Sequence, residues 1–269
     1  MREDTRHSAA LTLIELIEGW RRVGVTEGMS LIVHSSLSTF GPVDGGAATV
    51  VESLLTVLGP SGTLVVPAFT WQVADPHPEH VGAADSFVID RRAATPDFHA
   101  DLRSTGMGAV AEFVRTHPSS VRSSHPQASV AAIGAHATEV VAHQPLGFAV
   151  GLASPFARLH DLGGHILLAG VGHDRNTFLH YAESLTPRPR LKTRRFPWKI
   201  DGERVWVETV DVGDDNGRHF PTVGRDFEQS TGLGHALVGN AECRLIAAEP
   251  FVSFATTRLA ALLEADRHA

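Results

Sequence analysis

The chain of 269 residues contains a single cysteine, Cys243. One thiol excludes an internal disulfide and any zinc site built from several cysteines, and it is compatible with a reducing cytoplasm. We interpret Cys243 as a small buried hydrophobic residue rather than a reactive thiol. No stretch approaches the roughly 18 apolar residues that a membrane-spanning helix needs, and the N-terminus lacks the continuous apolar segment of a signal peptide. We therefore expect a soluble, cytoplasmic protein that has no membrane partner.

Basic residues are also scarce, because 23 Lys and Arg face 30 Asp and Glu, which gives a formal net charge of -7. This balance argues against a nucleic-acid partner and suits a cationic substrate if the acids line a cleft. The alternative is that the acids only keep the surface soluble. A composition of 43% hydrophobic and 20% charged residues is typical of a globular protein. Since no repeat, low-complexity tract or linker interrupts the chain, residues 1–269 are predicted to form one domain.

Hydrophobic patterning predicts an α/β fold. The segments Ser30–Val33, Ala47–Leu58 and Thr63–Phe69 form a strand, a helix and a strand, which is a βαβ unit and favours a mostly parallel central sheet covered by helices. Further strands are expected at Ser129–Gly134, Ile166–Ala169 and Gly239–Ala248. Further helices are expected at Leu11–Val23, Gly106–Thr116, Ala135–His143, Pro155–Leu162, Phe178–Leu185, Phe220–Ser230 and Pro250–Ala265.

Two segments depart from this alternation. Arg194–Ile200 and Glu203–Val212 have a period of two and flank Asp201-Gly202, a strong hairpin signal, so an antiparallel hairpin extension is predicted near 194–212, within residues 190–215. Residues 70–103 are polar and contain few apolar side chains. Loops of this length are usually functional or mobile, and we expect this one to lie on the substrate side.

The densest set of chemically capable side chains follows the apolar run Ile166–Ala169. A polar stretch leads into the expected helix, with Asn176 or Thr177 as its N-cap, and on that helix His180 and Glu183 are three residues apart. This spacing places both on one face, where the carboxylate favours the imidazole as a general base. Catalytic groups are common just beyond the carboxyl ends of buried strands. The alternative is an ordinary structural pair on a solvated helix face.

A second candidate site follows the strand Ser30–Val33. Ser35, Ser36 and Ser38 offer hydroxyl groups, and nearby glycines offer unhindered amides, close to the start of the next helix. Such groups suit an anion. The segment has neither the GK[ST] ending of a phosphate-binding loop nor a GxGxxG fingerprint, so a nucleoside triphosphate or a dinucleotide is not expected. The alternative is that Ser35 and Ser36 only cap the loop.

Several stretches together resemble one known family. LIVHSSLSTFG, GGAATVVESLLTVLGPSGTLVVPAFTW, RSSHPQASVAAIG, SPFARLHDLGGHILLAGVGHDRNTFLHYAE and VGNAECRL have the order and approximate spacing of the aminoglycoside 3-N-acetyltransferase family, and the resemblance covers almost all of the chain from Leu31 onward. It implies acetyl-coenzyme A as the acetyl donor and an α/β fold distinct from that of the GNAT acetyltransferases. It also implies a small-molecule amine as the acceptor.

The resemblance assigns two coenzyme-binding segments. The pantetheine and pyrophosphate segment of the family matches His34, Ser35, Ser36, Leu37 and Gly41. Its basic segment matches Arg122, Ser123, His125 and Ser129. Coenzyme A carries several phosphate charges, and helix-start amides, hydroxyls and an arginine fork suit such a ligand without a metal. For His125-Pro126 a rigid turn is the alternative.

The expected reaction follows from the chemistry of amines. An aminoglycoside amine is mostly protonated at neutral pH and has no lone pair for attack, so a base must remove a proton, and His180 polarised by Glu183 fits this role. Thr177 and the backbone amides of Ser36-Leu37 are candidate donors to the oxyanion. With no suitable thiol in the motif loops, the acetyl group is expected to transfer directly within a ternary complex. Substrate contacts are expected from Trp71, Asp75, Asp174 and Glu183.

Other functions remain open at this stage. Some members of the family acetylate amines other than antibiotics, so the acceptor, the position acetylated, the biological role in resistance or metabolism, and the choice between a monomer and a homodimer are not fixed. A metal-dependent hydrolase would use His173, His180 and a carboxylate, but the chain has no HExxH motif and we expect no metal. The remaining alternative is a coenzyme-binding protein that has lost its chemistry.

Overall fold

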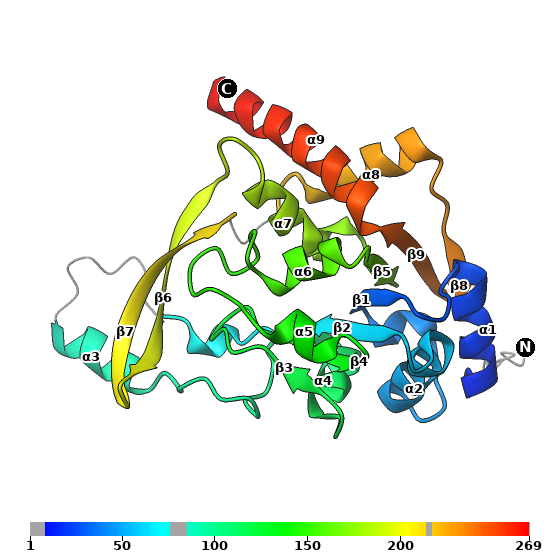
Figure 1. The fold of residues 1–269 in the computed structure, drawn as a ribbon, viewed down its shortest axis with the longest axis horizontal. Helices are drawn as coiled ribbons and strands as arrows, with labels where there is room; N and C mark the ends of the chain where they lie inside the picture. The colour runs from blue at the N-terminus through cyan, green and yellow to red at the C-terminus, as the bar shows by residue number, and fades with distance from the viewer. Residues whose placement is uncertain (1–8, 76–84, 214–216, 269) are drawn as a thin grey trace, which may run out of the picture.

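A computed structural model describes residues 9–75, 85–213 and 217–268. Within these ranges the chain forms a sheet with helices on both faces and a separate hairpin that extends from one end (Figure 1). The described helices include none that is long and apolar enough to cross a membrane. Parts of two segments that the sequence singled out, 76–84 of the polar stretch and 214–215 at the end of the hairpin segment, lie outside the described residues.

The main sheet has the strand order β3-β4-β2-β1-β5-β9-β8. Its centre is parallel, because β1 (Ser30–Ser35) pairs in parallel with both β2 (Thr63–Pro67) and β5 (His165–Ala169). The outer strands join antiparallel, and they are β3 (Val121–Arg122), β4 (Val130–Gly134), β8 (Ala236–Val238) and β9 (Ala241–Ala247). The predicted α/β class, the parallel centre and the separate hairpin are confirmed. The two shortest edge strands have no periodicity to detect and were not predicted.

Two helix layers cover the sheet. One face packs against α1 (Leu13–Val23), α2 (Ala47–Leu58) and α4 (Gly108–Thr116). The other face packs against α5 (Ala137–Val141), α6 (Pro155–Asp161), α7 (Phe178–Ser184), α8 (Phe220–Thr231) and α9 (Ala248–His268). Successive residues of a strand point to opposite faces, so Ile32 lies in one core and Leu31 in the other. This explains why the central strands are continuous apolar runs.

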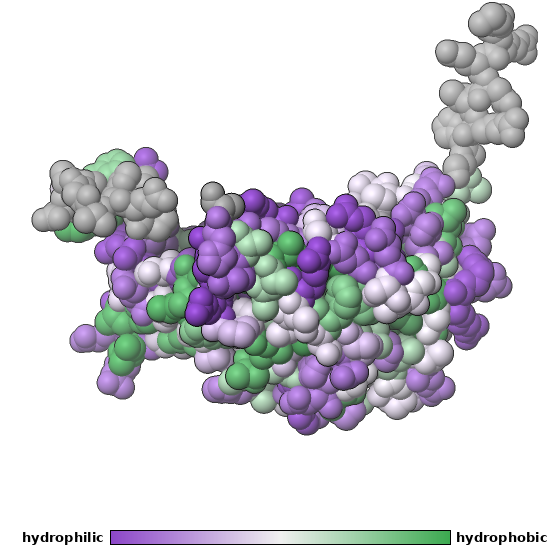
Figure 2. Space-filling view, turned by 90° about the horizontal axis from the view of Figure 1, so that it is seen from above, coloured by the Kyte–Doolittle hydropathy of each residue, from purple (hydrophilic) through white to green (hydrophobic). Residues whose placement is uncertain are grey.

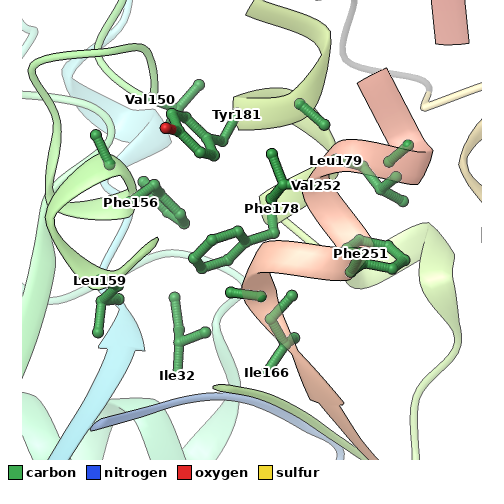
Figure 3. Close-up of a cluster of buried hydrophobic side chains, with 14 of the residues drawn as sticks. Ile32, Val150, Phe156, Leu159, Ile166, Phe178, Leu179, Tyr181, Phe251 and Val252 are labelled. Atoms are coloured by element: carbon green, nitrogen blue, oxygen red, sulfur yellow. The ribbon is translucent and has the colours of Figure 1, made fainter. Parts of the chain in front are cut away.

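The core on the α7 side is rich in aromatic rings (Figure 3). Phe178 of α7 makes edge-to-face contacts with Phe156 of α6, at 5.5 Å between ring centroids, and with Tyr181 of α7, at 5.9 Å. Leu179 and Ala182 are also buried. Of the side chains of α7, only His180 and the terminal Ser184 are partly exposed. The helix that carries His180 is therefore fixed on a rigid support.

The outer surface of this helix layer is polar. Figure 2 views the molecule from above, onto the side where α9 lies in Figure 1, and shows hydrophilic residues over much of this face with hydrophobic ones in small separate areas. The apolar residues of α9 that are buried, among them Phe251, Leu259 and Leu263, point inward. This distribution is typical of a helix that covers a sheet on one face only.

The predicted hairpin is confirmed, with β6 (Leu191–Ile200) paired to β7 (Glu203–Val212). Asp201 and Gly202 have φ angles of 52° and 83°, as a two-residue turn of this hand requires. The hairpin contacts the body through Phe196, which is fully buried and meets the His125 ring edge-on at 5.4 Å. It thus forms a wall beside the sheet rather than a free arm.

The expectation of a loop over residues 70–103 is wrong in part, because the stretch contains the short 3-10 helix η2 (Trp71–Val73) and the helix α3 (Asp85–Ala93). Arg92 of α3 donates to the buried carboxylate of Asp75, with Nη2 and Oδ2 2.6 Å apart, and its guanidinium lies 4.9 Å from the Trp206 ring of the hairpin. These contacts are between residues far apart in sequence, which the polar composition of the segment does not reveal.

Helix α8 packs closely against the loop after β5, and a substitution at Gly224 tests how much this packing contributes to stability. A Cβ atom added at Gly224 would overlap the His173 ring. That ring is held by a 2.9 Å contact to Glu228 and stacks on Phe251, so it has no room to move. Gly224→Ala is expected to lower the free energy of unfolding by about 3 kcal/mol, measured by urea denaturation. Gly234→Ala, at an exposed position with nothing within 4 Å of the added atom, should change it by less than about 0.5 kcal/mol. Equal stabilities would contradict the close packing.

Candidate active site

A cavity of about 1090 Å³ lies at the carboxyl ends of the parallel strands. It is lined by Val33–Ser38 at and beyond the end of β1, by Pro67 and Phe69 at and beyond the end of β2, and by Gly170–Gly172 after β5. This is the edge where open α/β sheets usually bind ligands. The cavity brings together most of the residues that the sequence singled out, which are His34, Ser35, Ser36, Leu37, Trp71, Asp174, Thr177 and His180.

His180, on α7, is one of the residues that line the cavity. Its side chain is 26% exposed, and its ring contacts the edge of Phe220 at 4.7 Å between centroids. Nδ1 of His180 lies 3.9 Å from Oε2 of Glu183, which is close for an electrostatic contact and longer than a hydrogen bond. Glu183 is fully buried behind the ring, so it does not line the cavity. The pair is therefore not the solvated structural pair that the spacing alone allowed.

Two neighbours of this pair were not predicted. Arg190 holds the Glu183 carboxylate through two bonds, Nε to Oε1 at 2.7 Å and Nη2 to Oε2 at 3.1 Å. Gly213 packs against both side chains, and a Cβ atom added there would lie 2.7 Å from His180 Nδ1. Both residues flank the hairpin, one before β6 and one after β7. No local motif marks them, since the contact depends on how the hairpin folds back.

The end of β1 and the loop that follows it form another part of the cavity lining. His34 is buried, and its Nε2 atom has no hydrogen-bond partner in the described protein. Burial lowers the pKa of His34 to about 3, so its imidazole is neutral at neutral pH. The Ser36 amide donates to the carbonyl of Ala169 at 3.1 Å and is not available to an oxyanion, which corrects one of the predicted donors. Gly41 ends the short 3-10 helix η1 (Leu37–Phe40) and is not among the lining residues.

The hairpin supplies a third side that the sequence did not predict. Arg194 of β6 donates through Nε to Oδ2 of Asp211 on β7 at 2.6 Å, and its guanidinium lies 5.6 Å from the Trp71 ring. All three residues line the cavity. Asp174 also lines it, paired with Arg175 at 3.1 Å. Asp75, by contrast, is outside the cavity and is engaged by Arg92.

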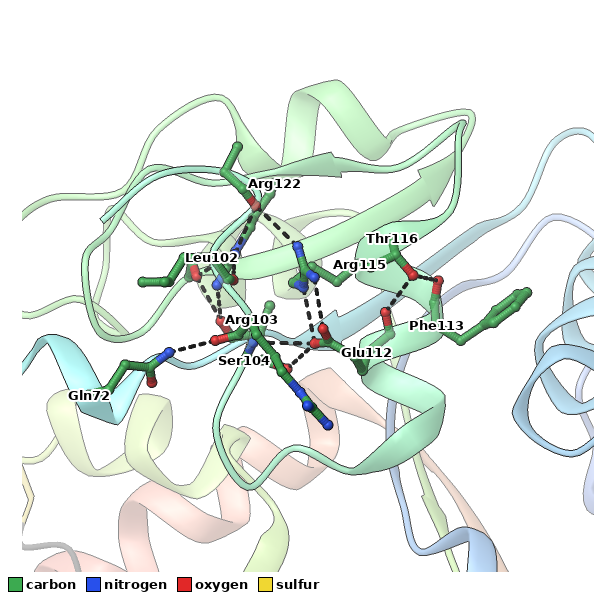
Figure 4. Close-up of polar contacts among 12 residues, drawn as sticks. Gln72, Leu102, Arg103, Ser104, Glu112, Phe113, Arg115, Thr116 and Arg122 are labelled. Carbon is green, nitrogen blue, oxygen red and sulfur yellow. Dashed lines mark hydrogen bonds and ion pairs between the residues drawn. The ribbon is translucent and has the colours of Figure 1, made fainter. Parts of the chain in front are cut away.

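The basic segment does not place its side chains in the cavity, because Arg122, Ser123, His125 and Ser129 are not among the lining residues, and their contact with the coenzyme stays a prediction. Arg122 donates to the backbone carbonyls of Ala68, Ala100 and Leu102 (Figure 4). Its pKa is lowered to about 10, first by burial and then by nearby Arg115, so it stays protonated. The guanidinium of Arg122 therefore links the backbones of neighbouring loops.

The other three residues of this segment are buried and bonded within the protein. Ser123 donates to Gln144 at 2.6 Å, and Ser129 donates to the carbonyl of Ala68 at 2.9 Å. Nδ1 of His125 accepts from the amides of Gln127 and Ala128 at 3.1 and 2.9 Å, and burial lowers the pKa of His125 to about 4. The two bonds at Nδ1 are those of a rigid turn, which was the alternative considered for His125.

The histidines proposed for a metal site have other neighbours. His173 Nε2 contacts Glu228 Oε1 at 2.9 Å, whereas His180 lies against Glu183 and Phe220. No group of three or more potential ligands of the His, Cys, Asp or Glu type occurs among the described residues. Cys243 is fully buried in the sheet, and burial raises the pKa of its thiol to about 12. The interpretation of Cys243 as a buried hydrophobic residue is confirmed.

Comparisons with known proteins identify the family and agree with the fold. A family model described as aminoglycoside 3-N-acetyltransferase matches residues 32–260. Aminoglycoside N(3)-acetyltransferase III of Pseudomonas aeruginosa is 32% identical over 251 residues, which cover 91% of this chain and 92% of that protein. The structure of AAC-VIa bound to sisomicin matches with a TM-score of 0.83 and 33% identity, over 94% of this chain and 98% of the other.

The structure of AAC-IIIb in a binary complex with CoASH matches with a TM-score of 0.82 and 27% identity, over 93% of this chain and 97% of the other. The family model alone spans far more than half of the chain. The motifs, the fold and these similarities lead to one conclusion. The chain is a member of the aminoglycoside 3-N-acetyltransferase family of acyltransferases.

Proposed function

We propose that this protein transfers the acetyl group of acetyl-coenzyme A to the 3-amino group of a 2-deoxystreptamine aminoglycoside, with His180 as the general base. The observation that carries the proposal is that His180 and the serine-rich loop Ser35–Ser38 line one cavity. Its volume of about 1090 Å³ is slightly above the range of about 300–1,000 Å³ common for one ligand, which suits a donor and an acceptor together. The relatives bound to CoASH and to sisomicin support the two substrate classes.

The part of the cavity at the end of β1 is suited to bind the acetyl donor. The unpartnered Nε2 of His34 and the hydroxyls of Ser35 and Ser36 can bond to the amide groups of a pantetheine arm. Because His34 is neutral, it adds no charge beside an incoming cation. The first residues of α4, Gly108 and Ala109, line the same side, where helix amides suit phosphate oxygens. Bound there, acetyl-coenzyme A supplies an acetyl thioester.

His180 and its neighbours then handle the proton and the developing charge. His180 removes a proton from the ammonium group of the acceptor, and the buried Glu183 stabilises the imidazolium that results. The neutral amine attacks the thioester carbon to give a tetrahedral oxyanion, and the carbon–sulfur bond breaks as this intermediate collapses to the amide. The nitrogen loses two protons in all, of which the leaving thiolate takes up one and the solvent takes up the other. The hydroxyl of Thr177, which is buried and lines the cavity, and the amide of Leu37 are the proposed donors to the oxyanion.

The transfer is proposed to be direct. The one thiol of the chain, Cys243, is fully buried, and its raised pKa leaves almost no thiolate at neutral pH. It is therefore a poor acetyl carrier, and the chain supplies no other cysteine. The acceptor attacks the thioester while both substrates occupy the cavity.

A second candidate acceptor is an amine that carries fewer charges than an aminoglycoside. The charge balance of the described cavity favours it, because both lining carboxylates are paired with arginines, Asp174 with Arg175 and Asp211 with Arg194. A polycation gains most from carboxylates that are not already neutralised. Simple amino sugars and other small amines are therefore candidate acceptors for the same chemistry.

One assay separates these possibilities. Release of thiol from acetyl-coenzyme A is measured with gentamicin-, kanamycin-, neomycin- and apramycin-type acceptors and with simple amino sugars. We expect turnover with at least one 2-deoxystreptamine aminoglycoside and an unmodified protein mass during turnover. Turnover with amino sugars alone would select the second candidate, and an acetylated protein would overturn direct transfer. Stabilisation by coenzyme A without any turnover would favour a coenzyme-binding protein.

A further inference from the structure

The carboxylate behind the proposed base is held by an arginine that no sequence motif marks. We propose that Arg190 is a positioning residue for the acetyl transfer: it fixes the orientation of the Glu183 carboxylate and offsets its charge, so that His180 remains in its base form. This inference rests on the proposed function. Arg190 is not among the residues that line the cavity, so it acts through Glu183 rather than on a substrate.

The geometry of the pair supports an orienting role. Arg190 meets both carboxylate oxygens of Glu183, at 2.7 Å and 3.1 Å, and a guanidinium with two such bonds fixes the plane of a carboxylate. Oε2 is the oxygen that also faces His180 Nδ1, at 3.9 Å. Glu183 is fully buried, so water does not compete for its oxygens. A carboxylate without this partner would be free to turn away from the ring.

The backbone strengthens the same arrangement. The amide of Gly213 donates to the carbonyl of Arg190 at 2.7 Å, which closes the base of the hairpin. Gly213 in turn packs against His180 and Glu183. The two ends of the hairpin therefore enclose the catalytic pair. The hairpin that carries Arg194 and Asp211 into the cavity also sets the position of the base.

The charge of Arg190 bears on the protonation of the pair. His180 and Glu183 act as a unit that works only when the imidazole is neutral and the carboxylate is ionised. A cation in contact with the carboxylate disfavours proton uptake by either member. Without this cation, the pH at which the pair takes up its first proton rises. As the pH is lowered, the base form is therefore lost earlier than in the parent protein. The sign is the same whichever residue takes the proton.

Other charged or titratable groups of the described chain lie around the pair, whereas Arg190 bonds directly to the Glu183 carboxylate. Beyond Phe220, His219 contacts Asp266 at 2.7 Å, and the pKa of Asp266 is lowered chiefly by that hydrogen bond and also by Arg218 and Arg190. The groups that share the cavity with His180 are His34 on β1, Asp174 and Arg175 on the loop after β5, Arg194 on β6 and Asp211 on β7. Of these described groups, Arg190 is the cation bonded to Glu183.

The test compares Arg190→Met and Arg190→Lys with the parent. Met keeps the apolar stem and removes the charge, whereas Lys keeps the charge but cannot form two parallel bonds. For Arg190→Met we expect the acidic limb of the pH profile of kcat/KM to move up by about one pH unit. We also expect kcat to fall about tenfold, while the KM for acetyl-coenzyme A changes less than about twofold. For Arg190→Lys we expect the limb to stay in place and kcat to fall about threefold.

Labelled-histidine NMR gives a readout that does not need turnover. The titration midpoint of His180, assigned with His180→Gln, should also move up by about one unit in Arg190→Met. Arg195→Met, which breaks an exposed pair with Glu208 on the same hairpin, is the control and should change neither value.

An unmoved midpoint and limb in a folded Arg190→Met would overturn the charge role, and normal kcat in Arg190→Lys would overturn the orienting role. If Arg190→Met does not fold, kcat and the limb in Arg190→Lys decide. A shifted midpoint in a protein that acetylates no amine would count against the proposed function alone.

Discussion

His180→Ala is expected to lower the turnover of acetyl-coenzyme A and an accepted amine by about 10²–10⁴-fold, the usual range for loss of a general base. The ring is the one imidazole that both lines the cavity and has a carboxylate within 3.9 Å, among the described residues. Without it, the acceptor ammonium must lose its proton to water before it can attack. The measurement is kcat from thiol release with both substrates at saturating concentration.

Coenzyme binding should survive in this variant. The groups proposed to hold the donor, His34, Ser35 and Ser36, come from a different segment of the cavity lining, at the end of β1, and keep their supports. Calorimetric titration with coenzyme A is therefore expected to give a Kd within about threefold of the parent. His136→Ala, which removes an exposed imidazole paired with Glu139, is the matched control and should keep normal turnover. If His180→Ala turned over normally, the assignment of the base would be wrong.

The candidate base could be predicted from the sequence because its signal is local. An apolar strand, a polar turn and a His/Glu pair three residues apart are sufficient to place His180 at the carboxyl end of β5. The roles of Arg190 and Gly213 could not be predicted in this way. Both contact the pair only because the hairpin returns the chain to α7, and neither composition nor periodicity encodes that return.

For the basic coenzyme segment, the sequence shows the chemistry of the side chains but not their contacts. Arg122, Ser123 and His125 have the residue types of an anion site, and the family resemblance placed them there. In the structure their polar atoms are used by backbone and side-chain groups from Ala68 to Leu146. Side-chain chemistry shows what a residue can bind, whereas burial decides what it does bind. Burial depends on contacts between distant segments, which one sequence does not reveal.

The same distinction applies to the fold. The strands β1, β2 and β5 are apolar throughout because helices cover both faces, so their pattern predicts a buried parallel centre. The antiparallel pairing of β4 with β2, and of β9 with β5, has no such signature in the sequence. Helix α3 was missed because its order depends on Arg92, which bonds to Asp75 and stacks on the hairpin. Tertiary contacts there outweigh the polar composition.

Gly213→Ala should lower kcat/KM by about 10²-fold. The added Cβ atom would lie 2.7 Å from Nδ1 and 3.1 Å from Cε1 of His180, and 3.2 Å from Oε2 of Glu183. Two of these distances are to the atoms through which the proposed base and its partner interact, so the ring has to move. A displacement of about 1 Å at a catalytic group can cost about 10²-fold in rate. The measurement is the thiol-release assay across a range of pH.

Backbone strain has to be separated from this collision, because Gly213 has a φ of 80° and an alanine there is strained in any surroundings. The same hairpin supplies the control. Gly202 has a φ of 83°, and nothing lies within 4 Å of a Cβ atom added there. Both variants should therefore lose about 1–2 kcal/mol of stability from the left-handed conformation, but only Gly213→Ala should lose activity. Equal activity of the two variants would show that His180 can work from another position, and the geometry proposed for the base would then be wrong.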